Sequence, residues 1–214
     1  KRGIWTDYGL MFINGEVPWE EVYNGITFPE YLCGGPEESS VAICHGGRTE
    51  FVYPPCEQSS IEFALERLEA DSLDDCHAQM SCSRFGKPLS EVMDRILNDE
   101  GLEAFNEVCH AAAKIPDRDL DKFTAAVLYA NANTSCEVCR IAESLELFEY
   151  APGERDTNSL GAWWLENKMD CSLPYEIDEF FDYAGYGESI VENNDGEFVE
   201  GLGFVCMEEG YTLE

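Results

Sequence analysis

The chain has few basic residues. Its 214 residues include 13 lysines and arginines against 44 aspartates and glutamates, which gives a formal net charge of −31. Nucleic acids and anionic lipid headgroups are bound by clustered Lys and Arg side chains, so we expect neither as a partner. Disorder is another cause of high net charge, but 44% hydrophobic and 12% aromatic residues are enough to fill a core. The composition therefore predicts a folded, acidic protein whose partners are cationic.

Long apolar runs are also missing. No stretch of 18 apolar residues and no secretory signal peptide is present, so we expect no direct insertion into a membrane. The chain is expected to be a processed product or an excised domain, such as the ectodomain of a larger protein. A Gly-x-Ser-x-Gly motif is absent, and none of the three histidines has an evident catalytic partner. These absences favour a non-enzymatic function.

Cysteine, by contrast, is abundant. A chain of this length buries about 70% of its unfolded surface in its own core, so cysteines are not needed to replace one. An even number of cysteines, spread along the chain, predicts disulfides, and structural disulfides persist in oxidising compartments. We therefore expect a secreted protein or one that resides in the lumen of the secretory pathway. The predicted half-cystines are Cys33, Cys44, Cys56, Cys76, Cys82, Cys109, Cys136, Cys139, Cys171 and Cys206.

Hydrophobic periodicity predicts an α+β fold. We expect a mainly helical core of short amphipathic helices, with short strands or hairpins at both termini and stabilisation by disulfides. Three successive regions are expected within one compact domain. They are an N-terminal hairpin and cystine-pinned loop region (1–57), the helical core (58–169) and an acidic C-terminal region with a hairpin (170–214).

Several helices are expected in the central region. Ser59 and Glu62 have the spacing of a capping box, Gly101 should interrupt a long helical pattern, and Thr134 or Ser135 should cap a later helix. The apolar side chains that recur at helical spacing define segments 59–68, 88–97, 102–112, 120–130, 138–148 and 160–164.

Strands are expected towards both ends, where they could pair with each other. Asn-Gly and Asn-Asp-Gly sequences between apolar runs are typical of hairpin turns. The expected strands are Leu10–Ile13, followed by a turn at Asn14-Gly15; Val41–Cys44; Ser189–Val191 and Phe198–Val199, joined by a hairpin turn at 194–196; and Phe204–Cys206.

Cys136-Glu137-Val138-Cys139 is the sharpest motif for chemistry. The apolar stretch 125–130 before it could be a buried strand, so the order strand, Cys-x-x-Cys, helix resembles that of thioredoxin-like proteins over about 75 residues. Leu173-Pro174 would then stand for the cis-proline of that family. The resemblance implies a thiol-disulfide oxidoreductase with Cys136 and Cys139 as the redox pair. Glu137, however, lies between the thiols, where a negative charge opposes the lowered thiol pKa that this chemistry needs.

The same stretch carries a glycosylation signal. Asn133-Thr134-Ser135 is an Asn-x-Ser sequon, and a helix N-terminus is normally accessible. We expect a glycan on Asn133 in the secreted protein.

The C-terminal region contains only acidic charges, because no Lys or Arg follows Lys168. If residues 176–182 are helical, four carboxylates lie within two turns, and divalent ions can bridge such groups. We therefore expect cation binding, with weak Ca²⁺ binding as one form of it and no other cofactor or metal. The predicted cation-binding residues are Glu176, Asp178, Glu179 and Asp182.

Charge, cysteines and missing catalytic motifs together favour a non-enzymatic, secreted or lumenal acidic domain that acts by binding. Its expected partners are cations, polycationic peptides or polyamines, a mineral or matrix surface, or another chain of the same assembly. The alternative is the oxidoreductase function at Cys136 and Cys139.

The cysteine pattern makes a direct prediction. Ten thiols in an oxidising compartment should form five intramolecular disulfides, and loss of one that closes a long loop should cost roughly 2–5 kcal/mol of stability. Peptide mapping of protein from native material, without reduction, measures this. Two or more free thiols would contradict the prediction.

Overall fold

The computed structural model describes residues 2–6, 9–13 and 39–207. Strands β1 (Arg2–Thr6) and β2 (Gly9–Ile13) pair in antiparallel fashion as a two-stranded sheet. The predicted strand at Leu10–Ile13 is therefore confirmed, with its partner before it in the chain. Its predicted turn at Asn14-Gly15 and half-cystine Cys33 lie outside the described residues.

The first three-stranded sheet has the order β4-β3-β5. It is formed by β3 (Ser40–His45), β4 (Arg48–Val52) and β5 (His77–Cys82), all antiparallel. Helix α2 (Gln58–Leu68) and the 3₁₀ turn η2 (Leu73–Asp75) connect β4 to β5. Val41 and Ile43 of the central strand are fully buried, because the side chains of alternate residues share one sheet face.

The longest helical segment is α3 (Lys87–Ala112), which the sequence predicts as two helices. Gly101 has φ 89° and ψ −178° inside it, so the helix is broken where the glycine was expected to break it. The apolar residues of both halves are buried on one side. Leu89, Met93 and Ile96 lie before the break, and Phe105 and Val108 lie after it.

Two shorter helices follow α3. The 3₁₀ turn η3 (Asp117–Asp119) leads into α4 (Leu120–Tyr129), and α5 (Ser135–Glu143) comes next. Thr134 caps α5 through a complete capping box. Its side chain accepts the N–H of Glu137, and the Glu137 carboxylate accepts the N–H groups of Asn133 and Thr134. These hydrogen bonds to the carboxylate hold the pKa of Glu137 below its usual value.

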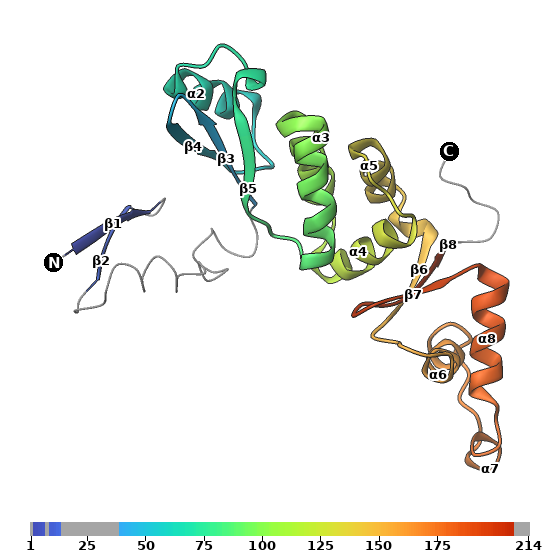
Figure 1. The fold of residues 1–214 in the computed structure, drawn as a ribbon. Coiled ribbons are helices and arrows are strands. Elements are labelled where there is room, and N and C mark those ends of the chain that lie inside the picture. The colour runs from blue at the N-terminus through green and yellow to red at the C-terminus, as the bar shows by residue number, and fades with distance from the viewer. Residues whose placement is uncertain (1, 7–8, 14–38, 208–214) are drawn as a thin grey trace.

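The second three-stranded sheet lies in the C-terminal half and has the order β6-β8-β7. The 3₁₀ turn η4 (Leu145–Leu147) precedes β6 (Phe148–Pro152), and β7 (Glu197–Val199) and β8 (Gly203–Met207) end the described chain. Between β6 and β7 the chain forms α6 (Thr157–Asn167), α7 (Tyr175–Asp178) and α8 (Tyr183–Asn194). Helix α4 lies near the sheet, and α6 and α8 lie together beyond it (Figure 1).

Helices α6 and α8 cross at two glycines. A Cβ atom on Gly161 would overlap the carbonyl oxygen of Tyr183, and one on Gly187 would overlap that of Thr157. The two backbones can therefore approach this closely only because both positions lack a side chain. Leu160 and Ile190 beside the crossing join Phe204 and Cys206 of β8 in a second, smaller core.

Most predicted helices are confirmed, but the predicted hairpin at 194–196 is wrong. Residues 189–191 belong to α8, and Asp195 ends that helix with φ 48° and ψ 38°. The Asn-Asp-Gly sequence indicates a residue with positive φ, and such a residue occurs both in a type I′ turn and at a helix C-terminus. The hairpin that does form joins β7 to β8 through 200–202. The predicted capping box at Ser59 is also wrong, because α2 begins at Gln58 without a side-chain cap.

Strands from the two ends of the chain do not share a sheet among the described residues. Each three-stranded sheet instead crosses a predicted region boundary. Strand β3 pairs across residue 57 with β5, and β6 pairs across residue 169 with β8. The mixed α+β class is confirmed.

The glycine crossing gives a stability prediction. Gly187→Ala should destabilise the protein by about 1–3 kcal/mol, because the new methyl group has no space against the Thr157 carbonyl and the helices must move apart. Chemical denaturation followed by circular dichroism measures this. The exposed neighbour supplies the control, since Glu188→Ala should change stability by less than about 0.5 kcal/mol. Equal stability of the two variants would contradict close packing at this crossing.

Candidate functional site

The predicted redox pair lies in the first turns of α5. Cys136 is exposed, Cys139 is half-buried, and the Arg140 guanidinium lies 3.5 Å from the Cys136 sulfur. Burial, together with the carboxylates of Glu107 and Glu143, raises the pKa of Cys139. An attacking thiol needs the opposite shift.

The thioredoxin-like arrangement around this pair is not formed. The predicted buried strand at 125–130 is wrong, because residues 125–129 are part of helix α4 and Ala130 ends it. Ala125, Ala126 and Val127 are fully buried in this helix, and an apolar run of that length does not distinguish strand from helix. The peptide bond before Pro174 is not cis either, since the cis bond of the described chain is Pro54–Pro55.

In the described part of the chain, free thiols are found at Cys44, Cys56, Cys76, Cys109, Cys136, Cys139, Cys171 and Cys206, so the predicted disulfide framework is not shown and stays a prediction. Cys56 and Cys109 nevertheless lie in the same neighbourhood. The Asn106 side chain of α3 exchanges two hydrogen bonds of 2.9 Å with the backbone of Cys56, and Cys109 lies one turn further along the same helix. Burial raises the pKa of Cys109, and the Cys56 thiol raises it further.

Each of the three histidines directly follows a cysteine, and the structure brings two of these dipeptides, Cys44-His45 and Cys76-His77, together. Cys44 pairs with His77 across strands β3 and β5, and the His45 ring nitrogen Nδ1 lies 2.8 Å from the Asp75 carbonyl oxygen. At the described positions, however, no three His, Cys, Asp or Glu side chains converge as a metal site would require.

The predicted glycosylation site sits in a small hydrogen-bonded cluster. The Asn133 amide is half-buried, donates to the carbonyl of Asn131 at 2.6 Å and accepts from Arg95. Ser135, which completes the sequon, is buried and donates to Glu100. Glycosylation of Asn133 stays a prediction, since a glycan is added to the chain before these contacts form.

The four predicted cation-binding acids lie in the segment between α6 and α8. Glu176 and Asp178 belong to α7, Glu179 follows it, and the Asp182 carboxylate accepts the N–H of Gly185 to cap α8. Asp178 accepts the hydroxyl of Tyr183. Two of the four carboxylates therefore have structural roles, and the four do not form one chelating group.

The same segment exposes large apolar side chains. Tyr175 is 82% and Phe180 81% exposed, and Met169 and Ile177 are more than half exposed. We call residues 169–182 the acidic–aromatic turn, because these side chains alternate with the acids Asp170, Glu176, Asp178, Glu179 and Asp182. Figure 1 shows α7 projecting at the end of α8, away from both three-stranded sheets. Sequence reasoning found the acids and missed the aromatic side chains, whose spacing equally suits a buried face.

A second feature, also missed, is a hollow of about 480 Å³ beside Arg84. Arg84 lies in the link between β5 and α3, where Ser39 accepts its backbone N–H at 3.2 Å. Its side chain is only 10% exposed, and its guanidinium carbon lies 5.6 Å from the centroid of the Phe85 ring. Arg84 thus places a nearly buried positive charge in a strongly acidic protein.

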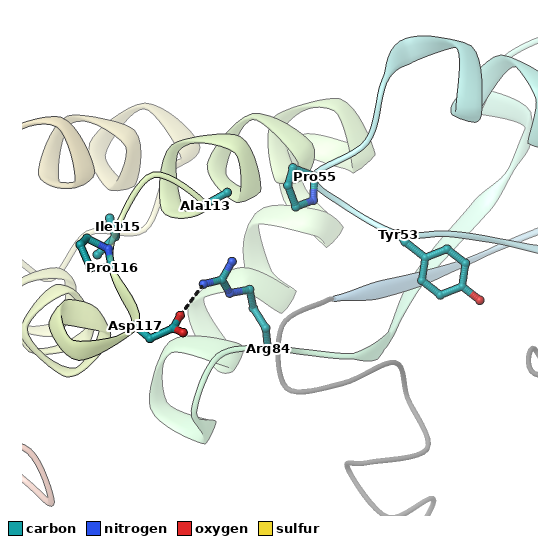
Figure 2. A pocket seen from close by; sticks show the side chains of 7 residues that line it. All are labelled: Tyr53, Pro55, Arg84, Ala113, Ile115, Pro116 and Asp117. Carbon is teal, nitrogen blue, oxygen red and sulfur yellow. Dashed lines mark ion pairs between the residues drawn. The ribbon is translucent and has the colours of Figure 1, made fainter.

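The charge of Arg84 is poorly compensated. Its Nη2 atom lies 3.7 Å from Oδ1 of Asp117, a side chain that is 85% exposed (Figure 2). Its Nε atom is buried and has no hydrogen-bond partner among the described residues. An ion pair of this length to an exposed carboxylate contributes little, so the guanidinium keeps unused hydrogen-bonding capacity.

The residues that line the hollow come from three separate parts of the chain. They are the loop after β4, the link that carries Arg84, and the turn between α3 and η3 (Figure 2). The apolar and aromatic lining residues are Tyr53, Pro55, Ala113, Ile115 and Pro116.

Comparison with known proteins does not assign this chain to a family. No protein-family model matches this chain, and a search of curated proteins finds no significant match. None of the described helices is long and apolar enough to cross a membrane.

The thiols give a prediction for the reduced, folded protein. Cys136 and Cys171 are exposed, whereas Cys109 and Cys206 are buried with pKa values raised to about 12 and about 11. Because the thiolate is the nucleophile, iodoacetamide at about pH 8 should alkylate the first two and leave the last two unmodified. Mass spectrometry after digestion measures this, with protein unfolded in guanidinium chloride as the control in which all four react. Rapid alkylation of Cys109 in the folded protein would contradict the described core.

Proposed function

We propose that this protein is a non-enzymatic binding domain of the secretory lumen or the extracellular space, and that its acidic–aromatic turn docks a cationic, amphipathic segment of a partner protein. The observation that carries the proposal is the near-complete exposure of Tyr175 and Phe180 on a projecting turn rich in carboxylates.

The exposed apolar side chains distinguish the acidic–aromatic turn from an acidic surface that serves only solubility. Single exposed apolar residues are normal, but four large ones within one short segment, rimmed by polar residues, are typical of an interaction site. Aromatic residues are also the most frequent anchors of protein interfaces. A face of this kind favours a partner that can cover aromatic rings.

Charge defines the partner further. The turn carries five carboxylates and no basic residue, and it belongs to a chain of net charge −31. This negative charge attracts basic partners over long range, which speeds their encounter with the turn, and it repels acidic partners. Polyamines, calcium or a mineral surface would satisfy the charge but would leave the rings of Tyr175 and Phe180 in water. A peptide with Lys or Arg beside apolar side chains satisfies both.

The test uses a designed peptide that forms an amphipathic helix, with Leu at positions i, i+3, i+4 and i+7 and Lys at the others. Isothermal titration calorimetry in about 0.15 M salt should show binding to the intact chain. The double substitution Tyr175→Ser and Phe180→Ser should weaken binding about tenfold or more, because exposed side chains can be replaced without loss of core packing while the interface loses its anchors.

Two controls accompany this measurement. Phe63→Ser removes an aromatic side chain that is 59% exposed on α2, outside the turn, and should leave affinity unchanged. A peptide in which Ser replaces Leu should bind weakly and lose that binding as salt is raised, since only charge then attracts it. Equal loss of affinity in the Phe63 variant and the turn variant, or equal affinity of the two peptides, would overturn the proposal.

A further inference from the structure

The hollow beside Arg84 has the volume of a small-molecule site, and five of its seven lining residues are apolar or aromatic. Such sites are typically concave and mostly apolar, contain a few well-placed polar groups and have volumes of roughly 300–1,000 Å³. Here the volume is about 480 Å³, five lining residues are apolar or aromatic, and the charged ones are Arg84 and Asp117.

Arg84 determines which ligand charge fits. A charge that is removed from water needs a partner of opposite sign. The described partner, Asp117, is 85% exposed and 3.7 Å away, which leaves the Arg84 charge only weakly neutralised. A planar guanidinium binds a carboxylate through paired hydrogen bonds, so a carboxylate is the anion that its geometry suits.

Two serine hydroxyl groups hold the backbone around Arg84 in place. Ser39 accepts the N–H of Arg84 at 3.2 Å, and the Ser90 hydroxyl in the first turn of α3 donates to the carbonyl of Phe85 at 2.8 Å. A link fixed at both ends presents the guanidinium with little loss of backbone entropy on binding. The site is therefore organised before any ligand arrives.

We infer that this hollow binds a small hydrophobic carboxylate, whose anionic end pairs with Arg84 and whose apolar body lies against Pro55, Ala113 and Ile115. Asp117 competes with the ligand for Arg84. The site is independent of the acidic–aromatic turn, which lies on a different part of the chain.

The test uses 4-phenylbutyrate, which combines a carboxylate with an apolar body. Binding is measured by chemical-shift titration of the ¹⁵N-labelled intact chain in about 0.15 M salt. At this concentration the salt screens the long-range repulsion between the ligand and the acidic surface, with a Debye length of ~8 Å. We expect saturable shifts at Ala113 and Ile115 with a dissociation constant of about 1 mM or below. Acetate, which lacks the apolar body, should bind at least tenfold more weakly.

Two variants move the affinity in opposite directions. Arg84→Gln should weaken binding about tenfold or more, because the cation is lost. Asp117→Asn should strengthen it several-fold, because the internal competitor is neutralised while its exposed position leaves the fold intact. If Arg84 only stabilised the fold, Asp117→Asn would not strengthen binding of the carboxylate.

The neutral amide, 4-phenylbutanamide, provides a measurement on the wild-type protein that does not depend on whether Arg84→Gln folds. It should bind at least tenfold more weakly than the acid. Equal binding of acid and amide, shifts confined to residues outside the hollow, or an unchanged affinity in Asp117→Asn would each overturn the inference.

Discussion

Strand β8 is the element on which the described C-terminal half depends. It is the central strand of its sheet, and its residues 203–206 are all buried. Because successive side chains of a strand point to opposite faces, Val205 joins the large core with α4 while Phe204 and Cys206 join the small core with α6 and α8. Two layers of helices are thus attached to one short strand. A shift of its pairing by one residue would exchange the two faces and disrupt both cores together.

Local sequence patterns were sufficient for most helices. The apolar spacing in α3, the interruption at Gly101 and the Thr134 cap of α5 all act over a few residues, so they can be read without knowledge of the fold. Strand β5 could not be found in this way. Its residues alternate between exposed and half-buried, and its polar composition gives a weak signal. Only its pairing with β3, which is more than thirty residues earlier, makes it a strand.

Ambiguous patterns explain the remaining differences. Asp195 needs positive φ whether it ends a helix or forms a hairpin turn, and residues 125–129 are apolar whether they form a strand or a helix. In both cases long-range packing against the second sheet decides the outcome. The candidate sites follow the same rule. The carboxylates of the acidic–aromatic turn were visible in the composition, but the exposure of Phe180 is a property of the folded chain. The Arg84 hollow combines residues from 53 to 117 that no local motif connects.

The close crossing of α6 and α8 also determines what a break in the covalent chain would do. Since Gly161 and Gly187 bring the two helix backbones together below the acidic–aromatic turn, its two ends are held at a fixed separation by packing as well as by the chain itself. Proteolytic cleavage within 169–182 would therefore produce two fragments that stay associated through Leu160, Ile190 and Phe204. Such a nicked protein would keep its folded body, and only the exposed segment 169–182 would be interrupted.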